Sequence, residues 1–132
     1  MIRQTAYAAL VALIAVPASA ASSITEDPEI TSVLVDNMIV TELTTICPSL
    51  APRTARVNRQ AKAMMQTISA KGYGVEDVQS LQDPAFLAEL AAKSESFFAA
   101  NGVEKRNTGA MCAFGKAQIA QRTPLGKLMK NR

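Results

Sequence analysis

Two cysteines, Cys47 and Cys112, constrain the fold of this 132-residue chain more than any other feature. They follow a segment that has the composition of a cleavable secretory leader, and paired thiols are oxidised to disulfides in exported proteins. Because two cysteines allow a single internal bridge, we expect a Cys47–Cys112 disulfide that joins two packed helices. Closing so long a loop would stabilise the fold by roughly 4 kcal/mol in the chain-entropy model.

The alternative role for these residues is a reactive thiol. Cys112 falls near the start of a predicted helix, where the helix dipole lowers the pKa of a thiol. The sequence has no C-x-x-C motif, which excludes a thioredoxin-like exchange site. Export and the even number of cysteines favour the structural disulfide.

Residues 1–20 have the three parts of a secretory signal peptide. Arg3 provides the positive start, residues 6–16 form an uncharged apolar run, and Ala18-Ser19-Ala20 matches the small-x-small cleavage pattern. The apolar run is shorter than the roughly 20 residues that a transmembrane helix requires. We therefore expect cleavage after Ala20 and a periplasmic or secreted protein, with residues 21–132 forming a single helical domain.

Apolar spacing, capping residues and helix breakers divide this domain into helices. Asp27-Pro28 and Asp83-Pro84 each combine an N-cap with proline at the first helical position. Gly72 and Asn101-Gly102 are typical of helix C-termini. The expected helices cover residues 28–47, 52–71, 75–81, 84–100, 108–121 and 124–129.

The predicted fold class is all-α, a small bundle of five to six helices with one disulfide, preceded by a signal peptide. Apolar residues do not alternate with a period of two over a useful length, so we expect no strands. Residues 39–40 and 44–46 are the exception in composition, because their β-branched side chains favour strand by propensity.

Charges are sorted into blocks along the chain. Residues 21–52 carry five acids and no base, and residues 53–71 carry five bases and no acid. Residues 72–104 carry six acids and one base, and residues 105–132 carry seven bases and no acid. One interpretation is that acidic and basic helices face each other across the rims of the bundle, where each exposed pair contributes only ~0.2–1 kcal/mol.

The second interpretation makes the last basic block an interaction surface. Its members are Lys116, Arg122, Lys127, Lys130 and Arg132. Leu125, Leu128 and Met129 would offer a small apolar face beside these charges. The block could contact a protein partner or an anionic membrane surface. On this view, deleting residues 127–132 removes binding and leaves thermal stability unchanged.

Nucleic acid is not an expected partner. Exported proteins rarely meet it, and Phe114 is the only aromatic residue within the basic blocks. We expect a monomer.

The composition argues against catalysis. The chain has no histidine, which excludes a Ser-His-Asp triad, a Cys-His pair and a histidine metal site within it. Glu76 and Asp77 are adjacent carboxylates, but their position at the start of a short helix predicts capping. Tyr73 lies between two glycines and is expected to cover the core. We predict no catalytic residue, no metal and no cofactor.

Several local patterns resemble an uncharacterised family of exported alphaproteobacterial proteins, classed only as a domain of unknown function. They are Cys47-Pro48, Gly72-Tyr73, residues 112–120 (CAFGKAQIA) and residues 123–128 (TPLGKL). The resemblance implies a helical fold and an exported setting, and it implies no activity. The small periplasmic acid chaperones, which are also helical with one disulfide, are a looser likeness with different cysteine spacing.

These observations lead to a functional hypothesis and two alternatives. We expect a non-catalytic periplasmic binding or accessory protein. The first alternative is a periplasmic acid or stress chaperone that exposes apolar helix faces when acid weakens the pairing between blocks. The second is a peripheral binder of anionic membranes that uses the basic C-terminus.

Overall fold

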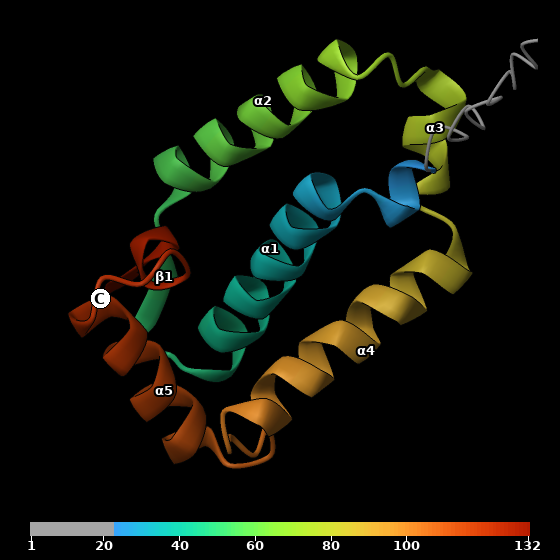
Figure 1. Cartoon of the computed structure of the whole chain (residues 1–132). Coiled ribbons are helices and arrows are strands. Elements are labelled where there is room, and N and C mark those ends of the chain that lie inside the picture. The colour runs from blue at the N-terminus through green and yellow to red at the C-terminus, as the bar shows by residue number, and fades with distance from the viewer. Residues whose placement is uncertain (1–22) are drawn as a thin grey trace, which may run out of the picture.

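The computed structural model describes residues 23–132, and the predicted signal peptide at residues 1–20 lies outside them. The described chain forms five α-helices, two 3-10 turns and one small sheet, in the following order: η1 (Ile24–Glu26), α1 (Pro28–Ile46), β1 (Leu50–Pro52), α2 (Thr54–Ala70), α3 (Val75–Ser80), α4 (Pro84–Ala100), α5 (Thr108–Ala120), η2 (Gly126–Leu128) and β2 (Met129–Asn131). α1 lies between α2 and α4, and α5 crosses the end of α1 beside β1 (Figure 1). The predicted helical bundle with one disulfide is confirmed.

The capping signals place most helix starts correctly. The Asp27 carboxylate accepts a hydrogen bond from the Glu29 backbone N–H at 3.0 Å, at the start of α1. At α3, the Asp77 carboxylate accepts one from the Gly74 N–H at 2.8 Å, which confirms its predicted capping role.

α1 runs without a break through residues 39–40 and 44–46, where propensity favours strand. Burial of this apolar face outweighs the strand propensity of its β-branched side chains.

The prediction that no strands form was wrong. β1 pairs with β2 in an antiparallel ladder, with Leu50 opposite Asn131 and Pro52 opposite Met129. Each strand has three residues, which is too short for a period of two to be visible in the sequence. As a result α2 begins at Thr54 rather than at Pro52.

The predicted last helix was also wrong. It is reduced to the 3-10 turn η2, after which the chain enters β2. Leu125, Leu128 and Met129 are 6%, 7% and 0% exposed and belong to the core, so they offer no apolar face to a membrane. Deleting residues 127–132 would remove β2 and part of this core. The expectation that stability survives that deletion is therefore withdrawn.

The larger of two apolar clusters surrounds the disulfide. It contains Ile39, Val40, Leu43, Cys47, Leu50, Phe98, Met111, Leu125, Leu128 and Met129. The Cys47–Cys112 bond has the predicted partners and an S–S distance of 2.08 Å, and it joins the residue after α1 to α5. Two glycines permit close packing here. A Cβ on Gly115 would meet the Leu50 side chain, and one on Gly126 would meet the Gln118 carbonyl.

The smaller cluster lies where the start of α1, the end of α2 and α3 meet. Ile24, Ile30 and Ile68 are buried in it, and Leu34, Met64, Tyr73, Val78 and Leu81 pack against them. The predicted position of Tyr73 over the core is thus confirmed. None of the helices within residues 23–132 combines the length and the apolarity that crossing a membrane requires.

Candidate functional site

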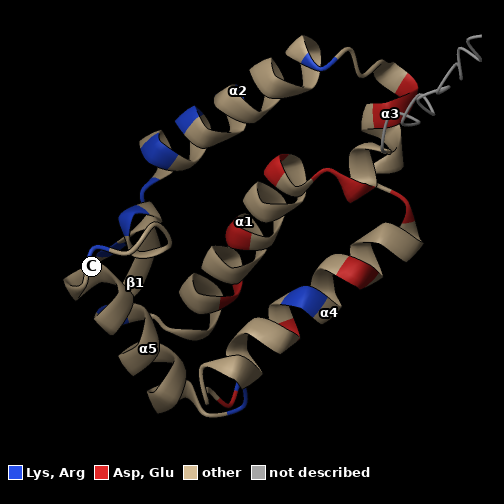
Figure 2. Ribbon diagram, in the orientation of Figure 1, with Lys and Arg blue, Asp and Glu red and all other residues tan. Residues whose placement is uncertain are grey.

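A cleft of about 570 Å³ opens where α2 begins and the chain ends. Its lining residues are Arg53, Arg56, Ile119, Ala120, Arg122, Gly126 and Lys127. Basic residues gather at this end of the molecule, whereas acidic residues lie over α1, α3 and α4 (Figure 2). The lining thus contains four cationic side chains and no carboxylate.

Two further basic residues extend this cleft along the surface. An adjoining hollow is lined by Arg53, Thr54, Ala55, Arg56, Arg59 and Lys130, again without a carboxylate. We refer to Arg53, Arg56, Arg59, Arg122, Lys127 and Lys130 together as the basic surface. It draws on two parts of the sequence, residues 53–59 and residues 122–130.

The small sheet brings these two parts together. The Arg53 backbone N–H donates to the Leu128 carbonyl at 2.7 Å, and Arg53 Nε donates to the Met129 carbonyl at 2.8 Å. Pairing of β1 with β2 therefore fixes the start of α2 against the C-terminal turn. The predicted site lacked Arg53, Arg56 and Arg59. The sequence shows that they belong to a block without acids, but it does not show the strand pair that brings this block beside the C-terminal turn.

The structure distributes the five predicted surface residues unequally. Arg122, Lys127 and Lys130 line the two hollows. Lys116 is exposed in the middle of α5, and Arg132 is exposed at the C-terminus, where its backbone N–H donates to the Ser49 carbonyl. Neither Lys116 nor Arg132 is among the lining residues of these hollows.

Ion pairs in residues 23–132 use other cations. Lys71 pairs with Asp27 and Glu29, Lys93 with Glu89, and Lys105 with Glu42 and Glu95. Acidic and basic blocks therefore do face each other at Lys71 and Lys105, as the first interpretation of the charges predicts. No ion pair in the described part of the chain involves the basic surface.

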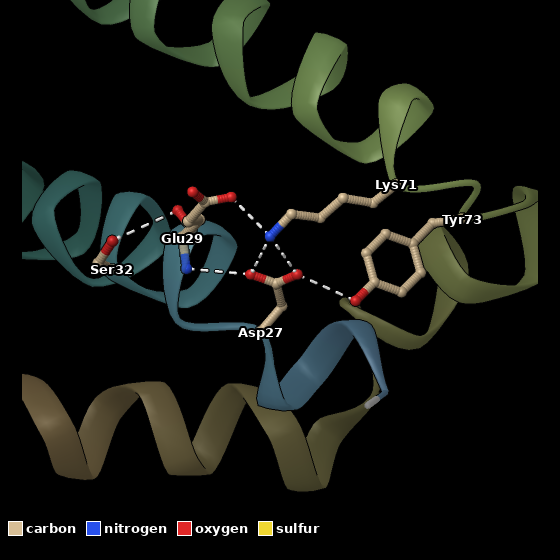
Figure 3. Close-up of polar contacts among 5 residues, drawn as sticks. All are labelled: Asp27, Glu29, Ser32, Lys71 and Tyr73. Atoms are coloured by element: carbon tan, nitrogen blue, oxygen red, sulfur yellow. Dashed lines mark hydrogen bonds and ion pairs between the residues drawn. The ribbon is translucent and has the colours of Figure 1, made fainter. Parts of the chain in front are cut away.

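A polar cluster lies where the start of α1 meets the end of α2 (Figure 3), away from the start of α2 where the cleft opens. Asp27 is 4% exposed. Its Oδ1 accepts from Lys71 Nζ at 3.0 Å and its Oδ2 from Lys71 Nζ at 2.8 Å and Tyr73 Oη at 3.0 Å. Glu29 Oε2 lies 2.6 Å from the same Lys71 nitrogen. We call these four residues the clamp, because they tie the start of α1 to the end of α2.

The clamp holds its carboxylate in the charged form. The hydrogen bond from Lys71 lowers the pKa of Asp27 below its ordinary value of 3.8, against the effect of burial, and Tyr73 and the Glu29 amide act in the same direction. Hydrogen bonds with Asp27 and Glu29 in turn raise the pKa of Lys71. Because both Asp27 oxygens are already occupied, the arrangement suits a structural tie rather than acid–base chemistry. Sequence reasoning missed it, since the residues are 44 and 46 positions apart.

A second tie joins α1 to α4. Lys105 Nζ lies 3.0 Å from Glu42 and 2.7 Å from Glu95, and Ser94 donates to Glu42 at 3.0 Å. Burial opposes the charged form of Lys105, but the hydrogen bonds with Glu95 and Glu42 raise its pKa. This group too is internally satisfied.

Two other kinds of chemistry find no site in residues 23–132. Both cysteines are in the disulfide, which removes the reactive thiol that was the alternative role of Cys112. No three Cys, Asp or Glu side chains in this part of the chain come together as a metal site requires. The basic surface is therefore the candidate functional site.

Comparison with known proteins adds a family and no activity. The family of unknown function DUF5333 matches residues 22–130. No curated protein and no solved structure matches the chain.

Proposed function

We propose that this chain, which belongs to DUF5333, a family of unknown function, is an exported, periplasmic binding or accessory protein without catalytic activity. Its partner is anionic and contacts the basic surface. One observation carries the proposal: six cations from two distant parts of the sequence converge on hollows that contain no carboxylate.

The disulfide supports the exported setting. Cys47 is fully buried, and the bond joins segments that are 65 residues apart. Such structural disulfides form and persist in oxidising compartments and are rare in the cytosol. The leader-like composition of residues 1–20 points to the same setting.

The charge pattern supports an anionic partner. Cations gathered without counter-charges repel one another, which destabilises the folded state, and the same field attracts an anionic partner and speeds its association. The carboxylates of Asp27, Glu42 and Glu95 form ion pairs with Lys71 and Lys105, and none of them pairs with the basic surface.

Burial of Leu125, Leu128 and Met129 changes how a membrane would be contacted. Without an exposed apolar face, attachment to an anionic bilayer would rest on charge alone. Polybasic attraction of this kind supplies about 1 kcal/mol per cation and falls off within a Debye length. Binding to either a protein or a membrane is therefore expected to be reversible and sensitive to salt.

A pair of charge-matched variants tests the proposal. Arg56→Gln/Lys127→Gln removes two exposed cations from the cleft, whereas Arg106→Gln/Lys116→Gln removes two exposed cations outside its lining. In affinity capture from periplasmic extract, the wild type and the control should retain the same companions and the cleft variant should lose them. Equal capture by both variants would show that the contact surface is elsewhere.

The clamp favours a second candidate, an acid or stress chaperone. Of the residues on α2, Ile68 alone is buried in the described structure, and the helix is tied at its end through Lys71 and Asp27. Protonation of Asp27 in strong acid would release that tie and expose the apolar stripe of α2. This candidate predicts increased binding of a hydrophobic dye, and suppression of client aggregation, near pH 3. Because the clamp lowers the pKa of Asp27, the dye signal is followed down to pH 2, and an unchanged signal between pH 7 and pH 2 would remove this candidate.

A further inference from the structure

We infer that the cleft between the start of α2 and the end of α5 binds a phosphate-bearing ligand. This inference rests on the proposed function and deepens it, because it assigns the chemical class of the anion. Three features of the same cleft support it.

The first feature is the kind of cation that lines the cleft. Arg53, Arg56 and Arg122 contribute guanidinium groups, with Lys127 beside them. A guanidinium presents a planar fork of donors that pairs with phosphate oxygens in a bidentate manner. Ile119 and Ala120 complete the lining with apolar surface. The cleft therefore offers several donors to one compact anion and an apolar wall to whatever carries it.

The second feature is the backbone of Arg122. Its φ is +52°, and it is the one non-glycine residue with a positive φ in the described chain. Its N–H donates to the Ile119 carbonyl and the Thr123 N–H donates to the Gln118 carbonyl, which together make a Schellman motif that ends α5. Glycine usually occupies this position because a side chain is strained there.

The strained residue is also one that lines the cleft. Glycine would be more stable at this position, and we interpret the arginine there as a residue whose side chain serves the cleft. Thr123 supports this turn from the other side, since its hydroxyl accepts from the Gly126 N–H at 3.0 Å.

The third feature is the start of α2. Arg53 occupies the N-cap without a capping hydrogen bond from its side chain, and the first turn contains no acid. Arg56 lies in that turn and lines both hollows. Cations at the positive end of a helix dipole are unfavourable, and an anion placed there relieves the repulsion. An anion in the cleft would therefore offset the repulsion among the cations at the start of α2.

A phosphate group suits this cleft better than a carboxylate does. A phosphomonoester carries a charge of about −1.5 to −2 at pH 7 and three acceptor oxygens in one compact group. A carboxylate carries a single negative charge, and an acidic peptide spreads its charges along an extended chain. Four cations around one hollow match the compact, multiply charged group.

Titration calorimetry with inorganic phosphate and pyrophosphate tests the inference on the mature disulfide-bonded chain, with citrate as the carboxylate comparison. Arg122→Gly and Arg56→Gln should each weaken phosphate affinity by about tenfold or more, because each removes a charge-assisted contact. Lys116→Gln should bind as the wild type does. Both cleft variants should melt at the wild-type temperature or above it, since Arg122→Gly removes backbone strain and Arg56→Gln removes a cation from the positive end of the α2 dipole.

Melting in phosphate separates specific binding from the general effect of the salt. Phosphate stabilises most folded proteins through exclusion from their surface. That part of the rise in melting temperature is shared by wild type and variants. The part due to binding should be smaller in Arg122→Gly, because its affinity for phosphate is lower.

Vesicles identify the source of the phosphate group. Co-sedimentation with phosphatidic acid vesicles, and not with phosphatidylcholine vesicles, would assign a lipid headgroup. Phosphate binding without vesicle binding would assign a small phosphorylated compound. Both outcomes support the inference.

Two results would overturn it. If citrate binds as tightly as pyrophosphate, the cleft does not select phosphate. If Arg122→Gly and Arg56→Gln keep full phosphate affinity, the cleft is not the site. The capture experiment then decides the proposed function separately. If Arg56→Gln/Lys127→Gln loses the companions that the wild type retains, the proposed function stands without the phosphate site. If the variant retains them, the proposed function fails as well.

Discussion

The two ends of this bundle are held together by different forces. The disulfide end, formed by the Cys47–Cys112 bond, the larger cluster, β1, β2 and η2, combines a covalent link with the main core. The clamp end, formed by the start of α1, the end of α2 and α3, combines three buried isoleucines with the Asp27–Lys71 tie. The first should respond to reductant and the second to acid.

This difference explains where the basic surface lies. Its hollows lie at the disulfide end, where backbone hydrogen bonds fix Arg53 against Leu128 and close the turn after α5. A binding site requires side chains that are held in place by their surroundings. The disulfide at the same end offsets part of the repulsion among the gathered cations.

Removing the disulfide should produce the largest effect. Cys47→Ala/Cys112→Ala opens a loop of 65 residues and should lower the free energy of unfolding by about 4 kcal/mol. Urea denaturation measures the loss against the oxidised wild type. A change below 1 kcal/mol would mean that apolar packing alone holds this end.

Gly126→Ala should have the next largest effect, also at the disulfide end. The added methyl would overlap the Gln118 carbonyl, which is backbone and cannot move aside, so a loss of about 3 kcal/mol is expected. Gly109→Ala is the control, because its Cβ would meet Asn107 Oδ1 at an ordinary 3.4 Å. Equal stability of the two variants in thermal melts would contradict the close approach of η2 to α5.

Asp27→Asn tests the clamp end. Asparagine keeps the helix cap but removes the charge, and the loss of the charge-assisted bond should cost about 2 kcal/mol at pH 7. Because the pKa of Asp27 is lowered in the folded state, its contribution is present above 3.8 and is lost as pH falls through the lower folded value. The stabilities of wild type and variant, measured by urea titrations from pH 7 to pH 2, should converge in that acidic window.

Asp36→Asn provides the control of opposite sign. Burial raises the pKa of Asp36, so its contribution is present at low pH and is lost as pH rises through the folded pKa. This variant should be at least as stable as the wild type at pH 7. If the free energy of unfolding of the wild type did not change between pH 7 and pH 2, the stabilising role of Asp27 in the clamp would be contradicted.

Arg56→Gln should have the smallest effect and the opposite direction. Removing a cation from the first turn of α2 should raise the free energy of unfolding by about 0.3–1 kcal/mol at low ionic strength. The gain should vanish in 1 M salt, where charges are screened within about 3 Å. Lys62→Gln, in the middle of α2, is the control and should change nothing measurable.

Local signals in the sequence account for most of the fold. Asp27-Pro28 and the glycine after α2 mark helix ends because they act within a few residues, and their effect does not depend on the rest of the molecule. The cysteine count likewise left one possible internal bridge. Helix-capping signals and apolar spacing, together with the two cysteines, were enough for the fold class.

The parts that sequence reasoning missed depend on contacts between distant segments. The β1–β2 pair is too short to produce a pattern, and without it the C-terminus reads as a helix with an exposed apolar face. That strand pair is also what joins Arg53, Arg56 and Arg59 to Arg122 and Lys127. The sequence therefore predicted the half of the site that comes from the last basic block. The other half, Arg53, Arg56 and Arg59, belongs to the site only because the fold brings α2 beside the C-terminal turn.

The cleft at the disulfide end is the proposed site for a phosphate-bearing ligand. Amide shifts in nuclear magnetic resonance spectra, followed while inorganic phosphate is added, test it most directly. We expect saturable shifts concentrated at residues 53–56 and 119–127, with the amides of Asp27, Lys71 and Tyr73 unchanged. Shifts at the clamp instead, or small unsaturable shifts spread over the whole chain, would contradict it.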